Sequence, residues 1–149
     1  MAEGDIVSKF KDRFPGVSED APAGCLMLPA EDIQDGCLFL KQDLGFDYLM
    51  CLSSVDYKDR FALVYHLYSF KSGDKLCLKV ILGRDNPAIK SITNIWPAAD
   101  WQEREAYDMM GINFIGHPDL RRILLPDDWL GYPLRKDYQR EGFVPMPQV

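Results

Sequence analysis

Apolar residues near the start of the chain recur at the spacing of an amphipathic helix. They fall on one face of a helix over residues 5–14, which Pro15 and Gly16 end. Pro29 opens a second predicted helix, and Gly45 ends it. The apolar stripe of this second helix comprises Ile33, Cys37, Leu38, Leu40 and Leu44. Both helices therefore offer one face for packing against another layer.

The middle of the chain contains three strand-like runs, Tyr48–Tyr57, Phe61–Tyr68 and Leu76–Leu82. Short, charged and turn-prone links join them, so the simplest arrangement makes them adjacent and antiparallel. Apolar residues occupy both parities of the second run, which indicates a central strand covered by helices on one face and partly covered on the other. A short strand is also expected over residues 25–28, after a polar loop over residues 17–24.

These elements predict an α+β fold, a two-layer sandwich in which helices pack on a mainly antiparallel sheet. Residues 88–95, after Pro87, are expected to form a short helix that helps to cover the sheet. An extended, irregular C-terminal segment completes the chain. We expect residues 1–138 to form a single domain and residues 139–149 to form an extended tail, since that stretch is proline-containing and has little to anchor it.

Residues 100–110 form a further predicted helix with a start and a stop signal. Asp100 is placed to accept from the first free amides, and Glu103, three residues on, completes a capping-box pattern. Gly111 supplies the left-handed residue with which helices commonly end.

Two carboxylates are expected to project together from this helix. Trp101, Glu105 and Asp108 share a face at spacings of four and three residues, and Arg104 lies one turn from Asp108. Such a pair could hold a metal or act in acid–base catalysis. The alternative is ion pairing that holds the C-terminal segment to the helix, and the same stretch supplies the partners Arg104, Arg121, Arg122 and Arg135.

The stretch after Gly111 lacks helical or strand periodicity, apart from a strand-like run over residues 112–115. Gly116, His117 and Pro118 turn the chain sharply. Fixed charges and large aromatic residues then alternate without a period, a composition typical of a permanent protein interface. A single chain could not easily bury these residues by itself; they include Asp119, Arg121, Arg122, Trp129, Tyr132, Arg135, Lys136, Asp137 and Tyr138.

Composition narrows the function classes. The chain has 149 residues, 47% of them hydrophobic, which suits one domain with a real core. A net charge of −6 argues against a nucleic-acid partner. The acidic, polar N-terminus is not signal-like and no apolar run is long enough to span a bilayer, so we expect a cytosolic chain.

The cysteines and histidines do not form a recognisable metal or cluster motif. The four cysteines are Cys25, Cys37, Cys51 and Cys77, with no C-x-x-C pair, and we expect them to be free and mostly buried. No glycine-rich phosphate-binding loop accompanies the arginines, so nucleotide binding is unsupported. His117 could be catalytic or redox-linked, but no nucleophile motif lies near it, and a structural or interface role is favoured.

The strings GHPDLRRILLPDDW over residues 116–129 and PLRKDY over 133–138, with ERE at residues 103–105, closely resemble the signature of the C subunit of respiratory complex I, the NuoC, NdhJ or 30-kilodalton subunit family. Upstream, residues 47–49, 55–57, 64–67 and 96–101 also resemble that family, so the resemblance covers roughly residues 26–138. Two departures are Tyr132, where many members have histidine, and Gln139, where proline is common.

The resemblance implies a cofactor-free assembly subunit in the hydrophilic arm of a proton-translocating NADH:quinone or ferredoxin:quinone oxidoreductase. It implies docking on the D and B subunits of that complex, and also on its I subunit, near the quinone site, with iron–sulfur clusters, flavin and quinone on partner subunits and membrane association through the complex alone. It implies a place on the cytoplasmic side of the membrane, or on the stromal side of a thylakoid. The isolated chain is expected to have no activity of its own.

The residues that would form the partner interface are Glu103, Arg104, Glu105, Asp108, His117, Asp119, Arg121, Arg122, Trp129, Arg135, Lys136, Asp137 and Tyr138. Two alternatives remain open. One is the homologous subunit of a membrane-bound hydrogenase or an F420-linked dehydrogenase. The other is a stand-alone enzyme that uses Glu105, Asp108 and His117, against which stands the lack of a nucleophile or metal-ligand motif.

Overall fold

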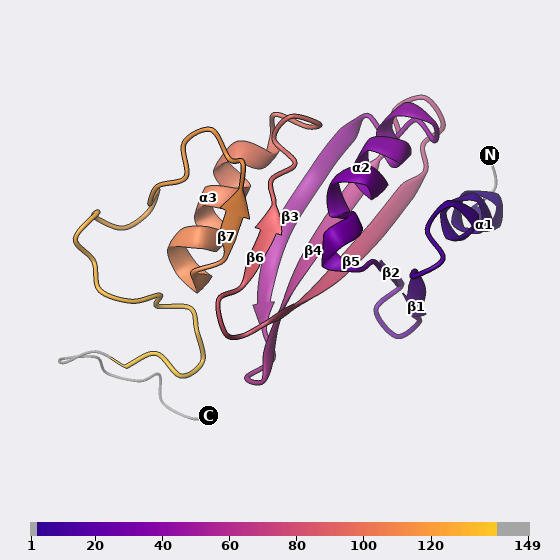
Figure 1. Cartoon of the computed structure of the whole chain (residues 1–149). Coiled ribbons are helices and arrows are strands. Elements are labelled where there is room, and N and C mark those ends of the chain that lie inside the picture. The colour runs from indigo at the N-terminus through magenta and orange to yellow at the C-terminus, as the bar shows by residue number, and fades with distance from the viewer. Residues whose placement is uncertain (1–2, 140–149) are drawn as a thin grey trace.

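A computed structural model describes residues 3–139 of the chain (Figure 1). Its helices are α1 (Glu3–Arg13), α2 (Ile33–Gln42), which the short 3-10 turn η1 (Ala30–Asp32) precedes, and α3 (Ala99–Met110). Its strands are β1 (Ser18–Asp20), β2 (Cys25–Met27), β3 (Tyr48–Asp56), β4 (Arg60–Tyr68), β5 (Lys75–Gly83), β6 (Ala88–Lys90) and β7 (Asn113–Ile115).

Five strands form one mixed sheet in the order β1-β2-β5-β4-β3. The three long strands pair antiparallel as neighbours, as their short links predict, and β4 lies between β5 and β3. Strand β2 joins the far side of β5 in parallel, and β1 pairs antiparallel with β2. The predicted strands are confirmed to within two residues at each end.

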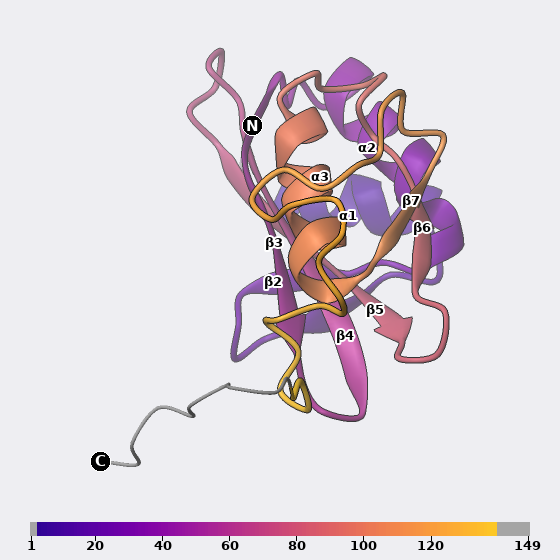
Figure 2. The ribbon, with the colours of Figure 1, turned by 90° about the vertical axis from the view of Figure 1, so that its left-hand side faces the viewer.

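All three helices lie on one side of this sheet (Figure 2). Alternation along β5 shows the consequence, since Leu78 and Val80 are fully buried under the helices whereas Lys79 and Ile81 on the opposite face are half-buried. Among the described residues, no helix lies on that opposite face. The predicted α+β two-layer architecture is confirmed.

Two predictions about local structure are wrong. Residues 88–90 form strand β6, which pairs in parallel with β7 in a separate two-stranded sheet, so no helix follows Pro87. The stretch 17–24 is not all loop, because Ser18–Asp20 forms the edge strand β1. In both places a strand of three residues is too short to show a period. The predicted tail, 139–149, lies almost wholly outside the described residues.

The N-terminal end of α3 also differs from the prediction. The helix begins at Ala99 after Ala98, with no side-chain cap, so Asp100 lies in its first turn. Glu103 does not reach back to the helix start, because its carboxylate binds a distant loop. The C-terminal end is confirmed: Gly111 has φ 76° and its amide bonds the carbonyl of Tyr107.

The prediction that all four cysteines are free is wrong. Cys25 and Cys77 form a disulfide with Sγ atoms 2.06 Å apart. The pairing follows from the parallel register of β2 and β5, which sets Leu26 opposite Leu78 and therefore Cys25 beside Cys77. Cys37 is free and buried, and Cys51 is free and exposed. Spacing along the sequence carried no sign of the pair.

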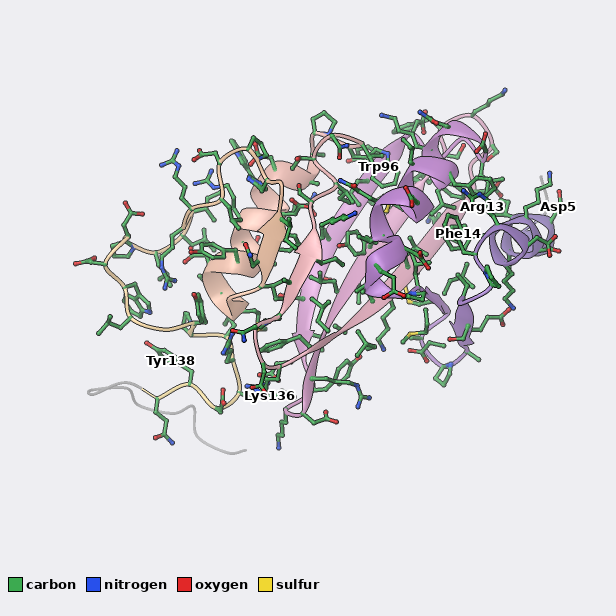
Figure 3. All side chains as sticks on the ribbon, viewed as in Figure 1. Asp5, Arg13, Phe14, Trp96, Lys136 and Tyr138 are labelled. Atoms are coloured by element: carbon green, nitrogen blue, oxygen red, sulfur yellow. A yellow bond between two sulfur atoms is a disulfide. The ribbon has the colours of Figure 1, made fainter. Side chains whose placement is uncertain are left out.

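After the turn at residues 116–118, the chain runs without helix or strand to the end of the described region at residue 139. We call residues 116–138 the C-terminal segment. It passes along the outer side of α3, on the left of Figure 1, and Figure 3 places Lys136 and Tyr138 at its lower end, across the molecule from Asp5 and Arg13 on α1. None of the helices in the described part is both long and apolar enough to cross a membrane.

Candidate functional site

Asp108 is the buried centre to which the C-terminal segment is attached. Its side chain is fully buried on α3, and its Oδ2 accepts from the amides of Ile123, Leu124 and Leu125 at 3.1, 2.7 and 3.0 Å. Its Oδ1 accepts from Arg122 at 2.8 Å. Burial alone would raise the pKa of Asp108, but Arg122 and the three amides hold it below its usual value.

Arg122 binds both α3 and a later part of the C-terminal segment. Its Nη1 donates to the backbone oxygen and the Oδ1 of Asp108, and its Nη2 donates to the carbonyls of Trp129 and Gly131 at 3.1 and 2.9 Å. The guanidinium carbon lies 5.1 Å from the ring centre of Tyr132. Its side chain is 11% exposed. Arg122 is thus a structural link inside the chain.

Arg104 does not pair with Asp108 as the helix spacing predicts. It is buried, and its Nε and Nη2 donate to the carbonyls of Arg121 and Arg122 at 3.2 and 3.0 Å. The helix face is also different from the prediction, because Glu105 is exposed while Asp108 is buried. The two carboxylates therefore do not project together. The prediction that arginines from the C-terminal stretch bind the helix carboxylates is confirmed for Asp108.

A second attachment holds the far end of the segment. Asp56, at the end of β3, accepts from Arg84 and from the amide of Lys136, the latter at 2.8 Å. Arg84 also donates to Asp137 at 2.7 Å. Although burial works in the opposite direction, Arg84 and the amides of Lys136 and Lys58 lower the pKa of Asp56 to about 2.

Phe61 joins this second attachment to the sheet. Its fully buried ring has the guanidinium of Arg84 at 4.7 Å and that of Arg135 at 5.0 Å. Arg135 donates to the carbonyl of Met110 at 2.7 Å and lies 4.9 Å from the ring of Tyr132. Gly111 allows this approach, since a Cβ there would lie 2.6 Å from the Tyr132 ring and 2.7 Å from Arg135.

Glu103 binds the loop between β6 and α3. It is fully buried, and its carboxylate accepts from the Ser91 hydroxyl at 2.6 Å and from the Ile92 amide at 2.8 Å. Burial raises the pKa of Glu103, an effect that these two donors only partly offset. Its position predicts a role in folding, not one on a partner surface.

His117 has structural bonds on both ring nitrogens. Nδ1 accepts from the amide of Asp119 at 3.0 Å, so Nε2 carries the proton and faces the backbone oxygen and the Oδ1 of Asp100, each 3.1 Å away. Its side chain is fully buried. Arg121 is different, since it is largely exposed and its ion-pair partner among residues 3–139 is the exposed Asp119, at 2.9 Å.

The remaining predicted residues are Trp129, Lys136, Asp137 and Tyr138 of the segment and Glu105 on α3. The Tyr138 hydroxyl donates to the carbonyl of Leu130 at 3.2 Å. Lys136 and Asp137 take part in the second attachment, Lys136 through its backbone, and Trp129 contributes its carbonyl to Arg122. Glu105 lines a groove of about 240 Å³ between β3 and α3, beside Leu134.

The outer surface of α3 and the segment carries exposed apolar side chains. Leu124 is 63% exposed and Leu130 is 79% exposed. Leu134, at 57%, and Trp101 on α3, at 71%, add to them. We call these four side chains the apolar surface set. A segment fixed by buried ion pairs while its leucines face solvent has the composition of an interface.

Sequence reasoning missed several of these residues. Asp56, Arg84 and Phe61 lie far from the segment along the chain, and only the pairing of β3, β4 and β5 brings them to its far end. The three leucines of the apolar surface set were missed because leucine in an irregular stretch shows no period. The sequence signal for this packing was the pair of glycines at positions 111 and 131. At both positions a side chain of the C-terminal segment packs against the glycine backbone.

Comparison with known proteins identifies the family. Residues 26–144 match the model of the family described as the 30-kilodalton subunit of respiratory-chain NADH dehydrogenase. The chain is 43% identical over 144 residues to the C subunit of NADH-quinone oxidoreductase from Moorella thermoacetica, covering 93% of this chain and 97% of that protein.

Two solved structures resemble the fold. One is the trypsin-resistant fragment of Nqo5, with a TM-score of 0.68 and 32% identity over 80% of this chain and all of that chain. The other comes from a membrane-bound sulfane sulfur reductase, an archaeal respiratory membrane complex, with a TM-score of 0.78 over 93% of this chain and 86% of that one. At 24% identity the latter shows a shared fold alone.

The family match spans most of the chain and includes α3 and the whole C-terminal segment with its two attachments. The chain therefore belongs to the family of the NADH-quinone oxidoreductase C subunit, the 30-kilodalton subunit of respiratory-chain NADH dehydrogenase.

Proposed function

We propose that this chain is a cofactor-free positioning subunit in the peripheral arm of a proton-translocating quinone oxidoreductase, on the cytoplasmic side of its membrane. Its C-terminal segment docks on the D and B subunits, with the I subunit alongside, and helps to hold the pair that carries the terminal cluster and the quinone pocket. NADH or ferredoxin supplies the electrons, and the redox centres belong to the partners.

The observation that carries this proposal is the apolar surface set, which lies on α3 and on a rigidly held but irregular segment. Asp108 and Arg122 fix the middle of the segment, and Asp56 with Arg84 fixes its end. Because the buried charges of Asp108, Arg122 and Asp56 are paired within the chain, the exposed leucines remain available as contact groups. A pre-ordered surface of this kind loses little conformational entropy when a partner binds.

The polar residues support a structural role over catalysis. A general base must reach a substrate proton, but Asp108 has both oxygens bound and His117 has both ring nitrogens bound. Glu105, the third member of the alternative catalytic set, is exposed and lies on another face of α3. Among residues 3–139, no three His, Cys, Asp or Glu side chains lie together in a way that could hold a metal ion.

The test is co-purification in mild detergent from native membranes, with a tag at the N-terminus, followed by mass spectrometry and metal analysis. The proposal predicts recovery of the large subunit and the cluster-bearing small subunit with quinone reductase activity, and no iron or zinc in the separated chain. Recovery of a nickel-bearing partner would instead support the hydrogenase alternative, and recovery of an F420-reducing partner would support the dehydrogenase alternative. An active chain without partners would overturn it.

A further inference from the structure

A row of cysteine and histidine side chains crosses the face of the sheet that no described helix covers. Cys51 on β3 is opposite His66 on β4, and His66 is opposite Cys77 on β5. Cys25 on β2 follows at the same level, bonded to Cys77. Their neighbours Leu52, Tyr65 and Leu78 point into the core, so this row points away from it.

The two cysteines of the disulfide differ in exposure. Cys25 is buried, at 6% exposed, whereas Cys77 is only half-buried. A cavity of about 300 Å³ adjoins both of them, between the loop after β1 and the start of β5, with Gly24 and Lys75 in its lining. A small thiol can enter there and attack the Cys77 sulfur.

The disulfide joins elements that are otherwise weakly paired. Strand β2 meets β5 through only two registered residue pairs, Leu26 with Leu78 and Met27 with Lys79, and β1 pairs only with β2. Outside this pairing, a Lys79–Asp20 ion pair of 2.9 Å and the bond from the Leu28 amide to the Lys79 carbonyl link the two sides.

We propose that Cys25–Cys77 is a reversible redox site that fastens β1 and β2 to the sheet, and that small thiols operate it. A thiolate attacks the Cys77 sulfur; the sulfur–sulfur bond breaks, and its electron pair leaves with the Cys25 sulfur, which takes a proton. A second thiol attacks the mixed disulfide and frees Cys77. In total the protein disulfide gains two electrons, and two thiols are oxidised to one disulfide.

Two neighbouring groups suit the reduced state. The Cys25 sulfur lies 3.6 Å from the carbonyl oxygen of Ala23, an acceptor for a thiol proton. His66, the exposed neighbour of Cys77 across β4 and β5, is placed to accept the thiol proton when the disulfide forms again. Burial raises the pKa of the Cys37 thiol, which keeps that cysteine out of the exchange.

The first test uses the full-length chain in mixtures of dithiothreitol and its cyclic disulfide, with acid trapping, alkylation and mass spectrometry. Cys25 and Cys77 should change together in one reversible two-thiol transition, while Cys51 is alkylated throughout. His66→Gln should slow re-formation of the disulfide severalfold with unchanged thiol counts. Independent labelling of the two cysteines, or a pair that is reduced only after unfolding, would overturn the proposal.

The second test is hydrogen exchange in the two states. Reduction should speed exchange of the β1 and β2 amides by about tenfold or more, with β3 and β4 unchanged. The Cys25→Ser/Cys77→Ser variant should behave like the reduced chain in both conditions, and Cys51→Ser should behave like wild type. Equal protection of β1 and β2 in both states would contradict the fastening role, whatever partners the chain binds.

Discussion

Arg122 of the C-terminal segment donates to two oxygens of Asp108, the backbone oxygen at 3.0 Å and the carboxylate Oδ1 at 2.8 Å. The other carboxylate oxygen of Asp108 accepts three successive amides of the same segment. A stretch with no strand or helix therefore has a fixed backbone, because one buried carboxylate replaces the hydrogen bonds that regular structure would supply.

Arg122→Ala should destabilise the isolated chain strongly, by about 3–5 kcal/mol, because it leaves the buried Asp108 charge without its partner. The matched control is Arg121→Ala, at the preceding residue. Within the described part of the chain its ion pair is exposed, so this change should alter stability by less than about 0.5 kcal/mol. Urea unfolding measures both. Both arginines were predicted at the partner interface, and Arg122 is in addition buried against Asp108. Equal effects of the two substitutions would contradict this difference between them.

Asp56 should make stability depend on pH between about 4 and 2. Because its pKa is lowered to about 2 in the folded chain, the carboxylate stabilises the fold fully above its unfolded pKa, and this contribution is lost as pH falls through the folded value. The loss should be at most about 2 kcal/mol. Asp56→Asn should flatten this part of the plot of unfolding free energy against pH. If the difference in stability between wild type and Asp56→Asn stays the same from pH 5 to 2, the lowered pKa of Asp56 is contradicted.

Glu103 should show the opposite sign. Its raised pKa means that the folded chain holds the proton more tightly, so its contribution falls as pH rises through the folded value. Glu103→Gln keeps an acceptor for the Ile92 amide without a charge, and its stability relative to wild type should increase from pH 4 to 7. Glu103→Ala should cost about 2–4 kcal/mol because Ser91 and Ile92 lose their acceptor. A glutamine variant as unstable as the alanine variant would show that the charge is required.

The long periodic elements could be predicted from sequence, since the strands over residues 48–83 and the amphipathic helices have enough residues to show a period. Strand β6 could not, because its three residues are stabilised by β7, which follows more than twenty residues later. The prediction that Glu103 caps its helix was wrong for the same reason. The local sequence fits a capping box, but a tertiary contact with Ser91 determines where the Glu103 side chain lies.

The sequence predicted which residue types gather in the C-terminal stretch, but it did not predict which residue each of them binds. Both Arg121 and Arg122 stand in one charged run, yet one is exposed and the other is buried, because only Arg122 lies where the segment crosses α3 above Asp108. The Cys25–Cys77 pair depends on the parallel register of β2 and β5, which no local feature of either strand reveals.

Binding of the wild-type chain and its Leu124→Ser/Leu130→Ser variant to the purified large D subunit is the most direct measurement of the positioning role. Phe70→Ser is the matched control, since Phe70 is 67% exposed and lies in the β4–β5 hairpin, at the upper right of Figure 1 and far from the segment. We expect that both variants melt like wild type, that the double leucine variant binds this partner at least about tenfold more weakly, and that Phe70→Ser binds normally. Full binding by the leucine variant, in a chain that remains folded, would contradict the positioning role.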